Sequence, residues 1–191
     1  MATNVEIKAR VRDWDALVRA VEALSDTPGE VLHQKDTFFS VPRGRLKLRV
    51  PSPGGGGQLI SYDRDDAAGP TPSRYVIAPV ADPGPVKAAL AAALGVRGVI
   101  RKTRHLYRAG RTRIHLDNVV TLGRFIELEV VLTDAHSPED GVARARDLMN
   151  RLDIRDADLV NEAYIDLCER CSNAPQGASS ERAHDEHGML G

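Results

Sequence analysis

The stretch Asn4-Val5-Glu6-Ile7-Lys8-Ala9-Arg10-Val11 alternates polar and apolar residues without a break. Successive side chains of a β-strand point to opposite sides, so its even-numbered residues form a polar face and its odd-numbered residues an apolar face. The polar face combines a carboxylate with two cations. This stretch therefore predicts a strand that presents charge on one side and core-forming side chains on the other.

The same alternation recurs four times further along the chain, at 45–50, 100–104, 111–117 and 125–131. The first two of these segments carry cations at the polar positions, whereas the last carries Glu127 and Glu129. An ordinary half-exposed antiparallel sheet also alternates polar with apolar residues. Like charges side by side repel each other, however, so their concentration on single strands indicates an anion and a cation to be bound.

Composition limits the class of protein. The chain has 191 residues, of which 42% are hydrophobic, and a formal net charge of −1. This length and composition fit one domain with a sizeable core. A protein that binds nucleic acid without sequence specificity would be net basic. Here 26 Lys and Arg residues are offset by 27 Asp and Glu residues. We therefore expect a local basic site and no nucleic-acid partner.

The chain shows no sign of export or of a membrane. No apolar run is long enough to cross a bilayer, and Met1-Ala2-Thr3-Asn4 leads directly into the first predicted strand. Two cysteines form no disulfide framework, which agrees with a reducing compartment. We expect a cytoplasmic protein without a membrane partner, and the sequence leaves a homodimer open.

Turn and cap residues divide the chain into elements. We expect β-strands over 4–11, 31–40, 45–50, 59–64, 74–80, 99–108, 111–118 and 124–133. We expect three helices capped by Asp13, Asp82 and Ser137, and a last helix over 157–170. If amphipathic helices cover an apolar outside, the charged faces must point at one another across an interior. The prediction is an α+β fold in which about eight antiparallel strands close into a barrel, or tunnel, with a charged lumen and helices packed outside.

The predicted lumen contains many cations and few carboxylates. The cations are Lys8, Lys47, Arg49, Lys102, Arg104 and Arg113, with Arg10, Arg45, Arg64 and Arg74 as further candidates. The carboxylates are Glu6, Asp117, Glu127 and Glu129. Arginine forks and lysine point charges in such number match a ligand with several adjacent phosphates. The carboxylates would repel that ligand unless a hard divalent cation lay between them, although a structural ion network produces similar patterns.

Several motifs, in order, resemble those of the CYTH domain, the triphosphate tunnel metalloenzyme fold shared by class IV adenylyl cyclases and thiamine triphosphatases. The opening Glu-x-Glu-x-Lys motif corresponds to residues 4–8, and the paired basic strand to 46–49. The later Lys-x-Arg strand corresponds to 102–104. The closing motif, an Asp followed by Gly-x-Phe-x-Glu-x-Glu, corresponds to Asp117 and 123–129. The resemblance covers about residues 4–167.

The resemblance implies a ligand and a metal. It implies that the triphosphate is bound by Lys47, Arg49, Lys102, Arg104 and Arg113. From the strand pattern we add Lys8, Arg64 and Arg74 to the predicted triphosphate-binding residues. It implies that Mg²⁺ or Mn²⁺ is bound by Glu6, Glu127 and Glu129, and we add Asp117 as a further candidate metal ligand. The implied activity is hydrolysis of a phosphoanhydride bond in tripolyphosphate or in an organic or nucleoside triphosphate. The alternatives are a class IV adenylyl cyclase, which forms cyclic AMP and pyrophosphate, and a non-catalytic binder of polyphosphate or nucleotide.

Three residues of this lumen bear on catalysis. Asn4 replaces the first Glu of the opening motif, which keeps an oxygen ligand but loses a charge. Either a second metal is then absent or weakly bound, or another carboxylate such as Asp117 compensates. Lys8 is the candidate catalytic residue, because desolvation beside other cations lowers the pKa of a lysine; phosphate binding alone is the alternative. His115 is interpreted as a structural histidine with hydrogen bonds rather than a titrating group.

The C-terminal region forms a separate case. We expect the CYTH domain to span 1–170 and 171–191 to form a disordered tail, since these residues are small, polar and charged. Cys168 and Cys171 with His184 and His187 approach the spacing of a zinc finger. The histidines are too close together for the usual pattern, and the segment between the pairs lacks apolar residues. We therefore expect no structural zinc there.

Overall fold

Eight strands and four α-helices make up the fold in the computed structural model, which describes residues 2–67 and 69–173. The strands are β1 (Ala2–Arg10), β2 (Glu30–Phe39), β3 (Arg45–Ser52), β4 (Gly57–Arg64), β5 (Thr71–Val80), β6 (Val96–Ala109), β7 (Thr112–Val119) and β8 (Gly123–Val131). The helices are α1 (Trp14–Leu24), α2 (Pro83–Leu94), α3 (Pro138–Arg151) and α4 (Tyr164–Asn173), with a 3₁₀ turn, η1, at Asp156–Asp158.

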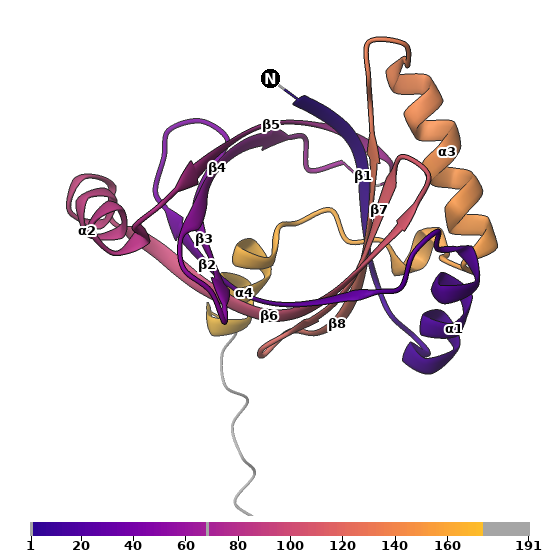
Figure 1. Ribbon diagram of the computed structural model, residues 1–191, viewed down its shortest axis with the longest axis horizontal. Coiled ribbons are helices and arrows are strands. Elements are labelled where there is room, and N and C mark those ends of the chain that lie inside the picture. The colour runs from indigo at the N-terminus through magenta and orange to yellow at the C-terminus, as the bar shows by residue number, and fades with distance from the viewer. Residues whose placement is uncertain (1, 68, 174–191) are drawn as a thin grey trace, which may run out of the picture.

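The strands close into a barrel, as the alternation predicts. Their order around the barrel is β1-β5-β4-β3-β2-β6-β7-β8, and every neighbouring pair is antiparallel. β1 pairs with β5 on one side and with β8 on the other, which completes the ring seen along the barrel axis in Figure 1. A closed sheet has only an inner and an outer face, so each strand's alternation assigns its side chains to one of the two.

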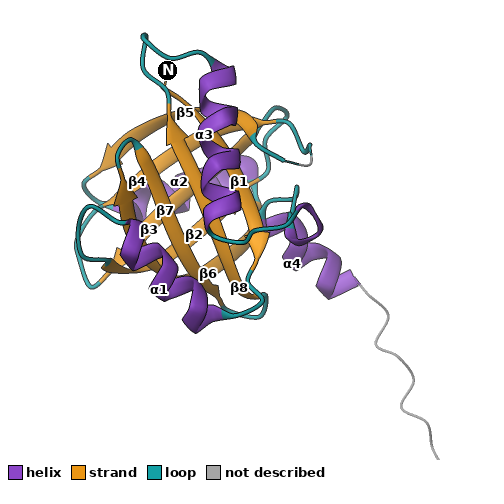
Figure 2. Cartoon of the chain, turned by 90° about the vertical axis from the view of Figure 1, so that its right-hand side faces the viewer, coloured by secondary structure: helices purple, strands orange, loops and turns teal. Residues whose placement is uncertain are grey.

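Helices cover part of the outer face. α1 and α3 lie over the side of the barrel formed by β1, β6, β7 and β8 (Figure 2). Leu17 and Val21 of α1 and Leu148 of α3 are buried there against outward-facing strand residues such as Ile114 and Leu128. α2 lies against β2 and β3 and has no buried residue. The apolar outer face is therefore covered most completely beside β1, β7 and β8.

The predicted caps start their helices. The Asp13 side chain accepts a hydrogen bond from the Ala16 N–H at 3.0 Å, and the Asp82 side chain accepts one from the Gly84 N–H at 3.1 Å. Ser137 forms a capping box with Asp140. Each cap satisfies an N–H group that has no partner within the first helical turn, so local sequence fixes these three starts.

The C-terminal helix differs from its prediction. Instead of one helix over 157–170, the chain forms η1, runs extended, and begins α4 at Tyr164. The extended part binds to the end of β1, where Leu159 forms a β-bridge with Ala9 and the Val160 N–H donates to the Lys8 carbonyl at 2.8 Å. Pairing with a strand requires extended backbone, which explains why the helix is interrupted here.

α4 fills one end of the barrel. Inward-facing Phe38, Ile100 and Phe125 lie near the same end of the barrel and pack with Ile165 and Leu167 of α4. In Figure 1 the segment that leads to α4 runs across the ring. The interior therefore has an apolar end occupied by α4, and the charged part lies beyond it.

No helix in the described part of the chain is long and apolar enough to cross a membrane. Most of the predicted tail, from residue 174 onward, lies outside the described residues, as do His184 and His187 of the zinc-finger-like pattern.

Candidate functional site

A cavity of about 320 Å³ lies inside the barrel beyond α4. Among the described residues, seven cationic side chains line it: Lys8, Lys47, Arg49, Arg64, Lys102, Arg104 and Arg113. Three carboxylates also line it, namely Glu6, Glu127 and Glu129. These ten residues come from six different strands, so closure of the barrel is what brings them together. The walls carry an excess of positive charge, as the strand patterns predict.

One predicted phosphate ligand lies elsewhere. Arg74 is exposed and is not among the cavity residues, whereas its neighbours Ser73 and Tyr75 are. β5 turns every second side chain inward, and its odd-numbered residues are the inward set. The predicted place of Arg74 in the lumen is therefore wrong, and we do not include it in the site.

Asp36 of β2 is a member of the site that the sequence analysis missed. It is almost fully buried and accepts hydrogen bonds from Arg49, from Nε to Oδ1 at 2.8 Å and from Nη2 to Oδ2 at 2.7 Å. Lys47 Nζ lies 3.2 Å from Oδ2. Burial raises the pKa of Asp36, but Arg49 and Lys47 outweigh it and hold this pKa well below its usual value. The signal was present in the sequence, since Asp36 shares the inward parity of Phe38.

Asp117 of β7, two strands away from β2 around the barrel, plays the same part. It is fully buried and accepts hydrogen bonds from Lys102 at 3.0 Å, from Arg104 at 2.6 Å and from the Tyr164 hydroxyl at 3.1 Å. Arg104 and Lys102 overcome the effect of burial and lower the pKa of Asp117. Asp117 does not line the cavity, and its oxygens are occupied by three donors. We therefore assign it to holding cations in place, which corrects its predicted role as a metal ligand.

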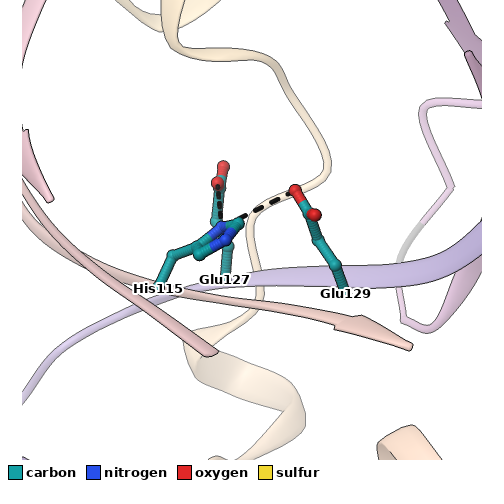
Figure 3. A group of neighbouring side chains, drawn as sticks. All are labelled: His115, Glu127 and Glu129. Carbon is teal, nitrogen blue, oxygen red and sulfur yellow. Dashed lines mark ion pairs between the residues drawn. The ribbon is translucent and has the colours of Figure 1, made fainter. Parts of the chain in front are cut away.

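Glu127 and Glu129 stand side by side on β8, with His115 of β7 between them (Figure 3). His115 Nδ1 lies 3.7 Å from Glu127 Oε2 and 3.6 Å from Glu129 Oε1. One ligand atom of each of the three residues lies within 4.8 Å of the other two. Burial lowers the pKa of His115, and Arg104 lowers it further, which favours the neutral imidazole.

Arginines hold these carboxylates in their charged form. Arg104 Nη2 donates to Glu127 Oε2 at 2.6 Å, and Arg113 Nε donates to Glu129 Oε2 at 2.8 Å. Burial raises the pKa of Glu127, but Arg104 and Lys8 outweigh it and bring this pKa well below its usual value. Both glutamates are thus available as anionic oxygen ligands.

β1 contributes the remaining oxygen groups. Glu6 Oε1 accepts a hydrogen bond from Arg64 Nη1 at 3.1 Å, while burial and the nearby Glu129 raise the pKa of Glu6 to about 7. Asn4 is 2% exposed, and its Oδ1 atom has no hydrogen-bond partner in the described part of the chain. A buried oxygen without a hydrogen-bond donor costs free energy of folding, so the Asn4 Oδ1 atom is a candidate neutral ligand for a cation in this cavity.

Lys8 extends from β1 to the boundary between the cavity and α4. Its Nζ donates to the Glu162 carbonyl at 2.9 Å, lies 3.5 Å from Glu127 Oε1, and stands 4.1 Å from the centre of the Tyr164 ring. Burial lowers the pKa of Lys8, which Glu127 only partly counteracts. A lysine in this setting can release its proton more readily than one in water.

The donor set fits a divalent cation. Carboxylate and amide oxygens are ligands for Mg²⁺ and Mn²⁺, and Glu127, Glu129, Glu6 and Asn4 present them toward one cavity. The facing cations match an anion with several charged oxygens. An inorganic or organic phosphate chain with a bound metal satisfies both halves of this arrangement.

The sequence matches the CYTH domain family over residues 2–164. The chain belongs to the CYTH family. This match includes all eight strands and every charged residue of the cavity. Family membership and the closed barrel agree with the resemblance seen in the sequence motifs.

Solved structures share the CYTH fold of this chain. The PH1012 protein of Pyrococcus horikoshii is 24% identical with a TM-score of 0.77, and the alignment covers 86% of this chain and 98% of that one. A protein of Vibrio parahaemolyticus assigned as an adenylate cyclase is 20% identical with a TM-score of 0.72, covering 87% and 97%. HpAC1 from Hippeastrum, an assigned adenylyl cyclase that reveals a dominant triphosphatase activity, is 15% identical with a TM-score of 0.62, covering 88% and 96%. Among curated proteins, no match to this CYTH chain was found.

Proposed function

We propose that this CYTH protein is a divalent-metal-dependent phosphohydrolase that cleaves a phosphoanhydride bond of tripolyphosphate or of an organic or nucleoside triphosphate. The observation that carries the proposal is the cavity wall, where seven cations face a smaller group of carboxylates. A single phosphate does not require so many cations. A chain of adjacent phosphates does, and the carboxylates then require a metal.

The cations bind and orient the phosphate chain. Arg49 and Arg104 are each held by a buried aspartate, so their guanidinium groups are already placed before a ligand enters. Donors fixed in advance stabilise charge that develops on the transferred phosphoryl group without reorganising during the reaction. Asp36 and Asp117 are therefore positioning residues in the proposed mechanism.

The metal would be held by Glu127 and Glu129, with Glu6 and Asn4 as further oxygen donors. When bound, a divalent ion neutralises charge on phosphate oxygens. Lys8 Nζ is the group that we propose to accept a proton from the attacking water, because burial lowers its pKa. Its hydrogen bond to the Glu162 carbonyl fixes the direction of Nζ during this transfer.

A class IV adenylyl cyclase is the second candidate, and the apolar part of the cavity favours it. Leu32, Ile77, Leu106 and Tyr75 line the same cavity as the cations and offer a surface for an organic group. In that reaction the ribose 3′-hydroxyl is the nucleophile. A binder without turnover is the third candidate, since Asn4 removes one negative charge from the metal side.

One set of incubations separates the three candidates. Purified protein is mixed with tripolyphosphate, ATP or thiamine triphosphate, each with Mg²⁺ or Mn²⁺. A triphosphatase releases phosphate, a cyclase forms cyclic AMP and pyrophosphate, and a binder gives heat on calorimetric titration without products. If no triphosphate binds at micromolar protein, the assignment of the cavity is wrong.

Glu127→Gln tests the carboxylate side. The amide keeps the size of the side chain but removes the charge, so metal-dependent turnover should fall by about 10²-fold. Glu139→Gln is the matched control, because Glu139 is exposed at the start of α3. Unchanged metal-dependent activity in Glu127→Gln would show that Glu127 does not hold the metal.

A further inference from the structure

We propose that His115 is itself a ligand of the divalent ion in this cavity, and that its nitrogen makes the site prefer Mn²⁺ and Co²⁺ to Mg²⁺. This inference deepens the proposed function, on which it rests for the presence of a metal. It also replaces the structural role that the sequence suggests for His115.

The distances from His115 to the two carboxylates fit a shared ion better than direct contact. Nδ1 of His115 is 3.6 Å from Glu129 Oε1 and 3.7 Å from Glu127 Oε2, too far for a hydrogen bond to either. In an octahedral site, metal–ligand bonds of about 2.1 Å place neighbouring ligand atoms about 3 Å apart and opposite ones about 4.2 Å apart. The observed separations lie between these limits.

No hydrogen bond in the described part of the chain engages the Nδ1 atom of His115. His115 is 4% exposed, and its Nδ1 atom has no hydrogen-bond partner among residues 2–67 and 69–173. Of the Glu129 oxygens, Oε2 accepts from Arg113, which leaves Oε1 directed at His115 (Figure 3). A buried nitrogen without a partner costs about 1–3 kcal/mol, so a ligand that contacts it removes that cost.

The backbone fixes this arrangement. His115 is the cross-strand partner of Glu127 in the β7–β8 ladder, and Arg113 is the partner of Glu129. His115, Glu127 and Glu129 therefore lie on two paired strands and not on a loop. Asn4 lines the same cavity with an unpartnered Oδ1, so an amide oxygen is available to complete the coordination.

The chemistry of the set determines the preference. Mg²⁺ favours oxygen ligands and keeps its waters, whereas imidazole nitrogen suits the transition metals. One nitrogen and two carboxylates with a neutral amide make a softer site than one built from carboxylates alone. The substitution that places Asn4 in the opening motif therefore changes which ion is bound, and His115 supplies the missing ligand.

Metal binding can be measured without any substrate. Full-length wild type, His115→Gln and the control His33→Gln are titrated with Mg²⁺, Mn²⁺ and Co²⁺ by calorimetry. His33 is exposed on the barrel exterior, where it contacts Thr103. We expect His115→Gln to weaken Co²⁺ binding by about tenfold or more while Mg²⁺ binding changes by less than about threefold. His33→Gln should bind all three ions as wild type does.

Pulsed electron paramagnetic resonance of bound Mn²⁺ gives a second readout that works on wild type alone, even if His115→Gln does not fold. A histidine nitrogen coupling in wild type that disappears in a folded His115→Gln supports the proposal. Bound Mn²⁺ without this coupling, or with coupling unchanged in His115→Gln, overturns it and leaves the proposed function intact. Failure of all three ions to bind, with tripolyphosphate present, overturns both.

Discussion

Arg104 and Asp117 form a closed pair inside the barrel, in which Arg104 Nε donates to Asp117 Oδ1 and Nη2 donates to Oδ2, both at 2.6 Å. The two residues are cross-strand partners of β6 and β7, and Asp117 is fully buried. This carboxylate compensates buried cations and fixes the direction of a guanidinium group at the same time. The cationic wall therefore depends on an anion that does not itself line the cavity.

Replacing Asp117 should destabilise the fold. Asp117→Asn removes the buried carboxylate that Arg104 and Lys102 share, which leaves Glu127 as the remaining partner of Arg104, and breaking a buried pair costs about 3–5 kcal/mol. Urea unfolding followed by circular dichroism measures this change. Asp63→Asn is the matched control, because Asp63 is exposed on β4. Equal stability of the two variants would contradict the role assigned to Asp117.

The two faces of the barrel should respond differently to loss of an arginine fork. Arg49→Lys keeps a positive charge beside Asp36 but cannot form the paired hydrogen bonds, so tripolyphosphate should bind about tenfold more weakly. Arg74→Lys should leave the affinity unchanged, because Arg74 points outward. Calorimetric titration of both variants tests this contrast. If only Arg74→Lys bound tripolyphosphate more weakly, the binding site would lie on the outer face of the barrel and the assignment to the cavity would be wrong.

Lys8 can be tested for proton transfer separately from binding. Arginine at this position attracts phosphate but does not give up its proton near neutral pH, so Lys8→Arg should lower kcat by about 10²-fold. KM should change much less. Steady-state phosphate release provides both constants. If kcat is retained, Lys8 acts as a phosphate ligand only.

Tripolyphosphate binding without metal should weaken as the pH rises. Burial lowers the pKa of Lys47 to about 8, and a lysine is cationic below its pKa and neutral above it. The wall therefore loses positive charge as the pH rises past about 8. For one proton, the affinity for tripolyphosphate falls by at most about tenfold per pH unit. Glu6, whose pKa is raised to about 7 by burial, gains negative charge over the same range and acts in the same direction.

Calorimetric titration with tripolyphosphate from about pH 6.5 to about pH 9.5, in steps of about one pH unit, follows this change. Lys47→Arg should show a shallower dependence, since arginine stays charged throughout. An affinity that rises with pH in wild type would exclude Lys47 as a phosphate-binding cation.

Packing of α4 into the barrel should contribute strongly to stability. Leu167 is 1% exposed among the aromatic and aliphatic side chains at that end, so Leu167→Ala should cost about 2–5 kcal/mol. Cys171→Ala on the same helix is the control, because Cys171 is exposed. Thermal unfolding compares the two. A neutral Leu167→Ala would show that α4 does not depend on this contact.

Local sequence predicted the barrel and most of its lining. Alternation assigned Lys8, Arg104 and Glu127 to the inner face, because the direction of a strand side chain depends only on its position along the strand. The helix starts were equally local, since a cap such as Ser137 satisfies N–H groups within a few residues of itself. The closed fold then followed from the need to cover one face and enclose the other.

Only the tertiary structure decided what each charge does. Asp36 reaches Arg49, and Asp117 reaches Arg104, because these residues are partners across ladders between different strands. Strand register also set His115 beside Glu127, and the β1 contact interrupted the last predicted helix. Alternation sorts side chains into two faces, but the partner of a charge depends on the register between strands, which the pattern within one strand does not contain.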